Sequence, residues 1–331
     1  PLRRQRQMCI RDRCNDMFRK VFPLLFTLSL IITCSSQEAV IEQDSHSAFT
    51  DIAALDLFVT SSEYKLLLSP DKFANIEQGF KDYWDIIQKV AEQENIPVLI
   101  SENPLKEKRA AVSFLDTETL DLRKNRYLLR HKRKYKGDIL PEKVEYTIKY
   151  RNRTAEEARS VDLTMSDKYY SKFDEIELET DIVYYSLLNG ELDITYSVGN
   201  AFDADGSVIF TLGDVMDVFP SLINLDLNPD IPLVNVAGVI VDERMVQMGH
   251  LDFGKGLLGR MDMSVWIIVP EAGDTVLISE FSFDHDFFRD KNFDPDAMAQ
   301  CRSFIDKLYE AKPDWVVPGA LKAAFVFDNH K

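Results

Sequence analysis

The stretch Val144-Glu145-Tyr146-Thr147-Ile148-Lys149-Tyr150-Arg151-Asn152-Arg153 alternates apolar and polar side chains along most of its length. Because successive side chains of a β-strand point to opposite faces, this pattern predicts a strand with one apolar face and one charged face. Residues 126–135 repeat the plan. Their basic face carries Arg126, Arg130, Lys132 and Lys134. Gly137-Asp138 between the two stretches is typical of a turn, so we expect a hairpin whose basic faces lie side by side.

These basic faces stand out against an acidic chain. The formal net charge is -16, yet residues 123–153 hold twelve Lys or Arg and only three acids. Like charges opposed on neighbouring strands destabilise a sheet by up to ~1 kcal/mol per pair. Two interpretations stay open. In the first, which the alternation alone favours, the basic face is the solvent-exposed side of an open sheet. In the second, the sheet closes into a barrel and the basic face lines its lumen.

A charged lumen would need carboxylates or a bound anion, because burying an unpaired cation costs several kcal/mol. Carboxylates are present on other predicted strands. Glu63 shares a strand face with Lys65, and Glu280 lies on the face of Ser282. Hard oxygen ligands at such positions suit Mg²⁺, so Glu63 and Glu280 are the candidate metal ligands. For the acidic run at alternate positions 175–181 we expect a solvated strand face.

The remaining pattern predicts an α+β domain over residues 51–331, because strands are many and helices few. Ser69-Pro70-Asp71 begins an amphipathic helix that ends near Glu94, and Asp294-Pro295 begins another. A third, short helix is expected over 214–222. The predicted strands are 64–68, 98–101, 111–114, 126–135, 143–151, 173–185, 236–241, 263–269, 275–283 and 322–327.

The first fifty residues predict export rather than fold. Residues 1–16 resemble translated sequencing-adapter sequence and are left out of the domain. Residues 17–34 form a signal peptide with a short apolar run, and 35–50 form a polar tether. Residues 30–34 resemble a bacterial lipobox, so we expect lipidation of Cys34 and a membrane-anchored lipoprotein of the bacterial cell envelope. The alternative is a plain cleaved signal with an incidental cysteine.

Four motifs in order resemble the CYTH, or triphosphate tunnel metalloenzyme, superfamily across roughly residues 60–328. They are Ser113-Phe114-Leu115-Asp116-Thr117, Leu120-Asp121-Leu122, Tyr127-Leu128-Leu129-Arg130-His131-Lys132 and Tyr146-Thr147-Ile148-Lys149. The resemblance implies an eight-stranded, or nearly eight-stranded, antiparallel barrel flanked by a few helices. It also implies a bound triphosphate with Mg²⁺ or Mn²⁺ for hydrolysis. Carried over by position, the phosphate-binding residues are Lys65, Arg130, Lys132 and Lys149, with Arg151 added because it shares their face, and the metal ligands are Glu63 and Glu280.

Two departures weaken the case for catalysis more than the case for anion binding. Ser61 stands where the family has the first Glu of its opening Glu-x-Glu-x-Lys motif, and Lys132 stands where it has an Arg. Three hypotheses therefore remain: a metal-dependent triphosphatase or phosphohydrolase, a non-catalytic module that binds a small polyanion, and an interaction lipoprotein with a wet charged face. The acidic balance outside 123–153 argues against nucleic-acid binding.

Overall fold

The computed structural model describes residues 59–169, 176–184, 192–269, 274–286, 294–317, 319 and 321–328. All of them belong to the second of the two units into which the chain divides, Ser45–Lys331. The predictions for the signal peptide, for Cys34 and for the tether fall outside the described residues. Within the described part, no helix is both long enough and apolar enough to cross a membrane.

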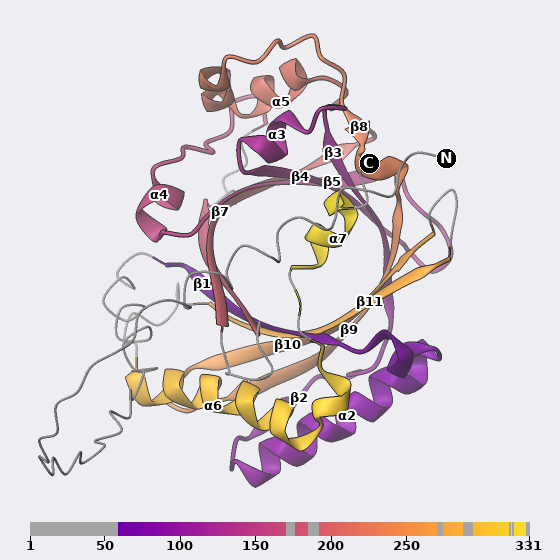
Figure 1. The fold of residues 1–331 in the computed structure, drawn as a ribbon, viewed down its shortest axis with the longest axis vertical. Coiled ribbons are helices and arrows are strands. Elements are labelled where there is room, and N and C mark those ends of the chain that lie inside the picture. The colour runs from indigo at the N-terminus through magenta and orange to yellow at the C-terminus, as the bar shows by residue number, and fades with distance from the viewer. Residues whose placement is uncertain are drawn as a thin grey trace, which may run out of the picture. The chain divides into compact units, whose positions relative to one another are not determined.

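Nine strands of the described chain close into a ring (Figure 1). Around the ring they are β9 (Val241–Asp252), β10 (Leu258–Ile268), β11 (Val276–Asp286), β1 (Ser61–Leu68), β6 (Glu177–Tyr184), β7 (Leu192–Asp205), β5 (Lys143–Asn152), β4 (Tyr127–Lys134) and β3 (Lys108–Asp116). Two shorter strands also pair with the ring: β2 (Val98–Ile100) lies antiparallel to β9, and β8 (Val234–Asn235) lies antiparallel to β3.

The α+β class was predicted from the pattern of strands and helices, and the closed barrel was implied by the family resemblance. The strand count and the pairing differ from the eight antiparallel strands that the resemblance implied. An odd number of strands cannot all be antiparallel around a closed ring, and one neighbouring pair must run parallel. That pair is β1 with β6, whose register places Glu63 opposite Asp181. The open-sheet interpretation of the basic faces is wrong, because β4 and β5 are wall strands of this ring.

The predicted hairpin of β4 and β5 is present, with Lys132 opposite Glu145 and Leu128 opposite Lys149. The alternation divides β5 as expected. Val144, Tyr146 and Ile148 are buried against helices outside the ring. Their polar neighbours face the interior of the barrel.

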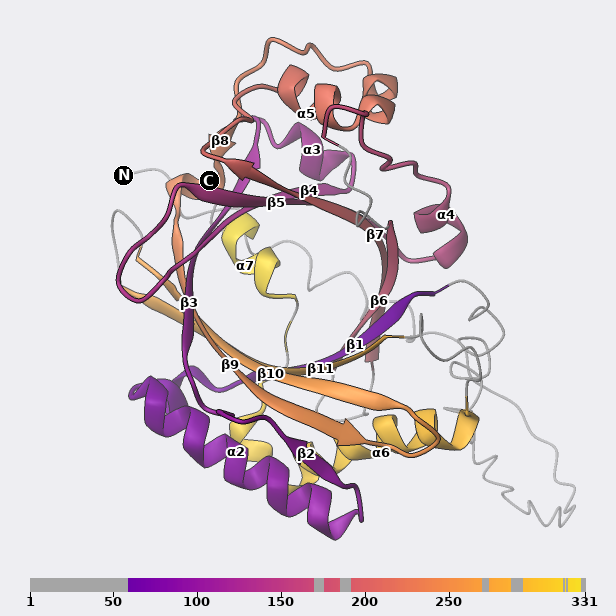
Figure 2. The same ribbon diagram turned by 180° about the vertical axis from the view of Figure 1, so that it is seen from behind.

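Helices cover two sides of the ring from outside (Figures 1 and 2). Against β9, β10 and β11 lie α2 (Ile76–Gln93) and α6 (Pro295–Ala311), which follow the predicted starts at residues 69–71 and 294–295. Their apolar stripes bury Tyr83, Ile87 and Cys301 in one core. Cys301 is a free, buried thiol, as expected for a core residue. Short 3₁₀ turns, η1 (Pro70–Phe73) and η4 (Pro313–Trp315), join these helices to the barrel.

The opposite side carries α3 (Asp121–Lys124), α4 (Ala155–Arg159), α5 (Leu212–Val218) and the 3₁₀ turn η2 (Pro220–Leu225). Of these, only the region of α5 and η2 was predicted as helical. The Asp116 carboxylate, from the Phe-Leu-Asp-Thr motif, accepts hydrogen bonds from the backbone N–H groups of Thr117, Leu122 and Arg123. This buried acid therefore orders the start of α3 and does not reach the barrel interior.

The last described element, α7 (Lys322–Asp328), lies inside the ring in both views (Figures 1 and 2). The sequence predicted a strand for 322–327, and this is wrong. The ring is already closed, so no sheet edge remains for this segment, and it meets its backbone hydrogen bonds as a helix. Phe327 packs on Phe114 at 5.6 Å between ring centroids, within an apolar cluster that fills one end of the barrel.

Two wall strands were not predicted. In β7, small and polar residues interrupt the apolar alternation, and β9 was foreseen only at its first residue. Residues 236–241 were expected to be a strand, but their first half forms the 3₁₀ turn η3 (Val236–Gly238), and only Val241 lies in a strand. In β9, Gly249 has φ +131°, and an added Cβ would lie 2.1 Å from the carbonyl oxygen of Leu99. Glycine thus permits the close approach of β2.

Candidate functional site

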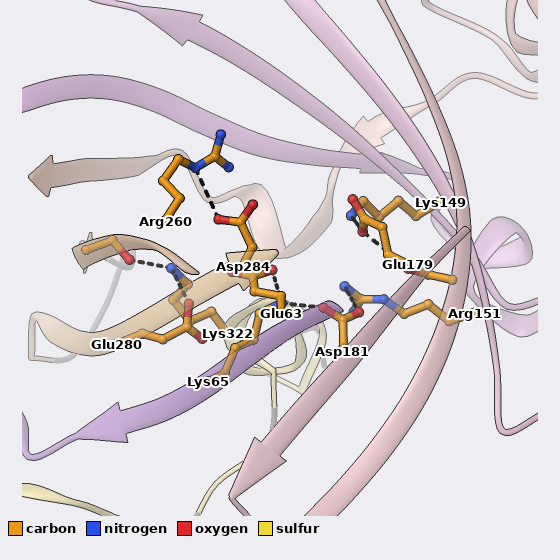
Figure 3. A network of polar contacts seen from close by, with 12 residues as sticks. Glu63, Lys65, Lys149, Arg151, Glu179, Asp181, Arg260, Glu280, Asp284 and Lys322 are labelled. Atoms are coloured by element: carbon orange, nitrogen blue, oxygen red, sulfur yellow. Dashed lines mark hydrogen bonds and ion pairs between the residues drawn. The ribbon is translucent and has the colours of Figure 1, made fainter. Parts of the chain in front are cut away.

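The interior of the barrel is charged where α7 does not fill it. Strand register fixes which side chains point inward: on β5 they are Glu145, Thr147, Lys149 and Arg151, and on β1 they are Glu63 and Lys65. Neighbouring strands add carboxylates at the same levels. Figure 3 shows Lys149 beside Glu179, and Arg151 and Lys65 pointing toward Asp181. Here most cations have a carboxylate partner on another strand.

The most enclosed cluster lies at the parallel seam. Asp181 of β6 is 1% exposed and pairs with the ammonium of Lys65. It also lies 3.5 Å from a guanidinium nitrogen of Arg151, and Lys65 reaches Glu63 at 2.7 Å. Burial alone would lower the pKa of Lys65, but Asp181 and Glu63 outweigh it and raise that pKa. Burial would raise the pKa of Asp181, but Lys65 and Arg151 hold it below its ordinary range.

Two further cations extend this cluster along β4 and β5. Lys149 pairs with Glu179 of β6. Arg130 lies 3.2 Å from Glu145 and donates a 3.0 Å hydrogen bond to the hydroxyl of Thr147. The Nε atoms of Arg130 and Arg151 are buried and have no hydrogen-bond partner within the described chain. Buried hydrogen-bond donors in proteins usually have an acceptor, so these two Nε–H groups favour an additional acceptor that the described chain does not supply.

On the far wall, Lys132 pairs with Glu243 of β9, which also accepts a 3.0 Å hydrogen bond from the indole of Trp266. Burial would raise the pKa of Glu243, but Lys132 lowers it to about 2. Burial lowers the pKa of Lys132, although Glu243 offsets part of the effect. From α7, Lys322 reaches Glu280 at 2.9 Å and lies over the ring of Trp266.

A cavity of about 170 Å³ lies among these groups. Its charged lining consists of the cations Lys65, Arg130, Lys149, Arg151 and Lys322 and the carboxylates Glu63, Glu243 and Glu280. The cations outnumber the carboxylates in the lining itself, but Glu145, Glu179 and Asp181 pair with them from beside the cavity. An anion would therefore bind by replacing carboxylate partners. The apolar part of the lining consists of Phe114, Leu128, Trp266, Leu321 and Ala323. Drug-sized ligands occupy roughly 300–1,000 Å³. The cavity therefore admits a small anion or one end of a larger one.

The two predicted metal ligands do not meet at a common point. Glu63 is opposite Asp284 in the β1–β11 register, whereas Glu280 is opposite Leu67, four residues further along β1. Four residues correspond to about 13 Å along a strand. Lys65 lies between them and interacts with both carboxylates. Among the described residues, no three His, Cys, Asp or Glu side chains are arranged to hold a metal ion.

Carboxylates also gather on the other side of Glu63. Asp284 of β11 and Asp262 of β10 flank Arg260, which lies 3.1 Å from Asp284 and 3.6 Å from Asp262. Burial, with a contribution from Glu63, raises the pKa of Asp262 and of Asp284 to about 6, against the effect of Arg260. This acidic group retains protons more readily than ordinary carboxylates.

The structure brings six of the seven predicted site residues to the cavity lining, and it places Lys132 beside it, paired with the lining residue Glu243. Sequence reasoning missed four partners: Glu179, Asp181, Glu243 and Lys322. The solvated face expected for the acidic run is wrong for Asp181, which is buried, and for Glu179, which faces the lumen. The signal was available, because Glu179 and Asp181 share one strand face while Leu178, Thr180 and Ile182 form the other, much as the residues of β5 divide.

No family model matches this sequence, and no curated protein matches it. Three solved structures resemble the fold. HpAC1 from Hippeastrum, a candidate adenylyl cyclase described with a dominant triphosphatase activity, shares 14% identity over 82% of this chain and 97% of its own, with a TM-score of 0.40. A candidate adenylate cyclase from Bacillus halodurans shares 11% sequence identity over 82% of this chain and 98% of its own, with a TM-score of 0.35. The PH1819 protein from Pyrococcus horikoshii shares 11% sequence identity over 81% of this chain and 99% of its own, with a TM-score of 0.32. Likenesses at this level assign no activity to this chain.

Proposed function

We propose that this protein binds a small, phosphate-rich polyanion inside its barrel. The observation that carries the proposal is the single cavity on which Lys65, Arg130, Lys149, Arg151 and Lys322 converge from four different elements. Guanidinium groups bind phosphate oxygens in a bidentate manner, and lysines add point charge. The buried, unsatisfied Nε atoms of the two arginines supply donors that phosphate oxygens would accept.

The size of the cavity favours tripolyphosphate, the end of a longer polyphosphate, or the phosphate end of an organic ester. A whole nucleotide would have to leave its base and sugar outside. Binding requires the cations to exchange carboxylate partners for phosphate oxygens. We therefore expect affinity to fall steeply with salt, as for other ligands held by charge.

Hydrolysis with Mg²⁺ or Mn²⁺ is the second candidate, supported by the carboxylates that line or flank the cavity. The chemistry such an ion supplies is neutralisation of charge on a transferred phosphoryl group. The arrangement described here does not fit one ion shared by Glu63 and Glu280, because Lys65 lies between them. We derive no catalytic step through a metal, and we favour binding without turnover.

The test is thermal unfolding of the purified protein with tripolyphosphate at low salt, with and without Mg²⁺ or Mn²⁺, while phosphate release is followed in the same samples. We expect stabilisation by tripolyphosphate that is lost in an Arg130→Ala, Lys149→Ala variant. Lys81→Ala, on the outer face of α2, is the matched control and should leave the stabilisation intact. Absence of any shift at low salt would refute the polyanion proposal, and metal-dependent release would establish an enzyme.

The place of binding in the cell is a separate proposal. We propose that the lipobox-like segment anchors the domain to an envelope membrane through Cys34, where polyphosphate or a phosphorylated compound is a more accessible ligand than a nucleotide. Replacement of Cys34 by Ser should release the protein from the membrane fraction. A variant that stays in that fraction would contradict the anchor.

A further inference from the structure

Two of the ion pairs in the barrel cross an intervening strand. Lys149 and Arg151 belong to β5, whereas Glu179 and Asp181 belong to β6, and β7 lies between these strands. Neighbouring strands are about 4.8 Å apart, so each pair spans about 10 Å of wall. A side chain can cover this distance only if it lies nearly flat against the strand that it crosses.

The inward face of β7 is shaped for this crossing. Ser197 lies opposite Arg151, and Gly199 lies opposite Lys149. Glycine in a strand interior weakens the strand, because it offers no side chain to pack and loses more conformational freedom on folding. Gly199 is not a residue of positive φ, so no turn or bulge explains its presence.

The contacts at Gly199 supply an explanation. A Cβ added there would lie 3.2 Å from Cγ and 3.6 Å from Cε of Lys149, and 3.3 Å from the carbonyl oxygen of Ile148. The stem of Lys149 therefore lies directly over the Cα atom of Gly199 on its way to Glu179. An alanine Cβ would require Lys149 to shift slightly, and the larger side chain of valine would push it further off the wall, toward the cavity that it lines.

We propose that Gly199 is a positioning residue, which holds Lys149 flat on β7 so that its ammonium stays at the wall and the anion cavity stays open. This inference rests on the proposed function, because it assigns Lys149 to the bound polyanion. Bulk at position 199 would both fill the cavity and remove the lysine from its carboxylate. The residue thus sets the size of the anion that the barrel accepts.

The experiment is a double-mutant cycle with two measurements. Gly199→Ala, Gly199→Val, Lys149→Ala and the double variant Lys149→Ala/Gly199→Val are each unfolded in urea without ligand, and each is titrated calorimetrically with tripolyphosphate at low salt. We expect Gly199→Val to weaken binding at least tenfold and Gly199→Ala two- to fivefold. In the Lys149→Ala background, Gly199→Val should change affinity less than twofold. Ala201→Val places the same valine side chain two residues along the same face, opposite Thr147, and should also change affinity less than twofold.

The unfolding measurement separates this inference from the proposed function. If Gly199 positions Lys149, the shift in urea midpoint caused by Lys149→Ala should be at least halved once Val occupies position 199, whether or not any ligand binds. Equal loss of affinity in both backgrounds, or additive midpoint shifts, would overturn the positioning role. If the parent protein binds no tripolyphosphate but the midpoint shifts are coupled, the proposed function fails and the positioning of Lys149 stands. Gly199→Ala keeps the cycle measurable if the valine variant does not fold.

Discussion

Replacement of Asp181 by Asn tests the electrostatic account of the barrel most directly. The carboxylate is 1% exposed, and its partners Lys65 and Arg151 have side-chain exposures of 10% and 18%. After the change Lys65 keeps Glu63, which is itself 32% exposed, and the influence of Glu280. Arg151 loses the carboxylate that it reaches at 3.5 Å. Breaking a buried pair by removing one partner costs about 3–5 kcal/mol. For a domain of this size we expect a drop in Tm of roughly 6–10 °C at neutral pH.

The same variant should respond more strongly to the ligand. In the parent protein a polyanion must displace Asp181 from Lys65 and Arg151, whereas in Asp181→Asn both cations lack that competitor. Tripolyphosphate should therefore raise the Tm of the variant by more degrees than it raises that of the parent. Differential scanning calorimetry at low salt, with and without tripolyphosphate, measures both effects. An unchanged Tm, or a smaller ligand-induced rise than in the parent, would refute this reasoning.

The pH dependence of this effect has a definite sign. The pKa of Asp181 is lowered in the folded protein, so its contribution to stability is present above the ordinary aspartate range, near 4, and is lost as pH falls through the folded value. The difference in Tm between the parent and Asp181→Asn should therefore be largest near neutrality and shrink in strong acid.

Three other perturbations follow from the same geometry. Burial raises the pKa of Asp284 to about 6, so ionisation of this carboxyl destabilises the fold as pH rises from about 4 to 6. In urea denaturation, Asp284→Asn should be more stable than the parent by about 1–3 kcal/mol at pH 7.5. At pH 4 the two proteins should be equally stable. Glu243→Gln leaves the buried Lys132 unpaired and should lower the free energy of unfolding by about 3 kcal/mol. The double variant Glu243→Gln/Lys132→Met should recover most of that stability. A double variant as unstable as Glu243→Gln would contradict the pairing. Gly249→Ala forces a Cβ against the carbonyl of Leu99 and should cost about 1–3 kcal/mol with faster amide exchange at Leu99.

The sequence predicted the local parts of this fold better than the strands that depend on distant partners. The β4–β5 hairpin followed from strict alternation around a recognisable turn, and α2 and α6 followed from apolar periodicity. Asp294 caps α6 at the predicted start, whereas α2 is capped by Asn75 and the predicted start at Ser69 begins the 3₁₀ turn η1. The wall strands β7 and β9 carry no such pattern. The residues on their inward faces depend on contacts with strands across the barrel, and local sequence propensity carries no information about those contacts.

The candidate site shows the same division. The bases of β5 were identifiable because they share one strand face. Glu63 and Glu280 were chosen as hard oxygen ligands on strand faces, and the family resemblance added Lys65 as a phosphate-binding residue. Asp181 could not be recognised as a partner of Lys65, because the two meet only across the parallel seam that closes the ring. Glu243 belongs to a strand whose composition, with Arg, Met and Gln, favours helix as readily as sheet.

The position of α7 bears on how the chain acquires this structure during synthesis. All nine wall strands precede Lys322 in sequence, so a ribosome releases the whole ring before it releases the helix that packs inside it. Until α7 is made, Phe114 and Trp266 lack the contribution of Val326 and Phe327 to their apolar cluster, so we expect the nascent barrel to be an incomplete intermediate that is prone to aggregation. A stop codon or a bulky fusion placed just before Lys322 would therefore trap every molecule in that intermediate, although the entire sheet had been made.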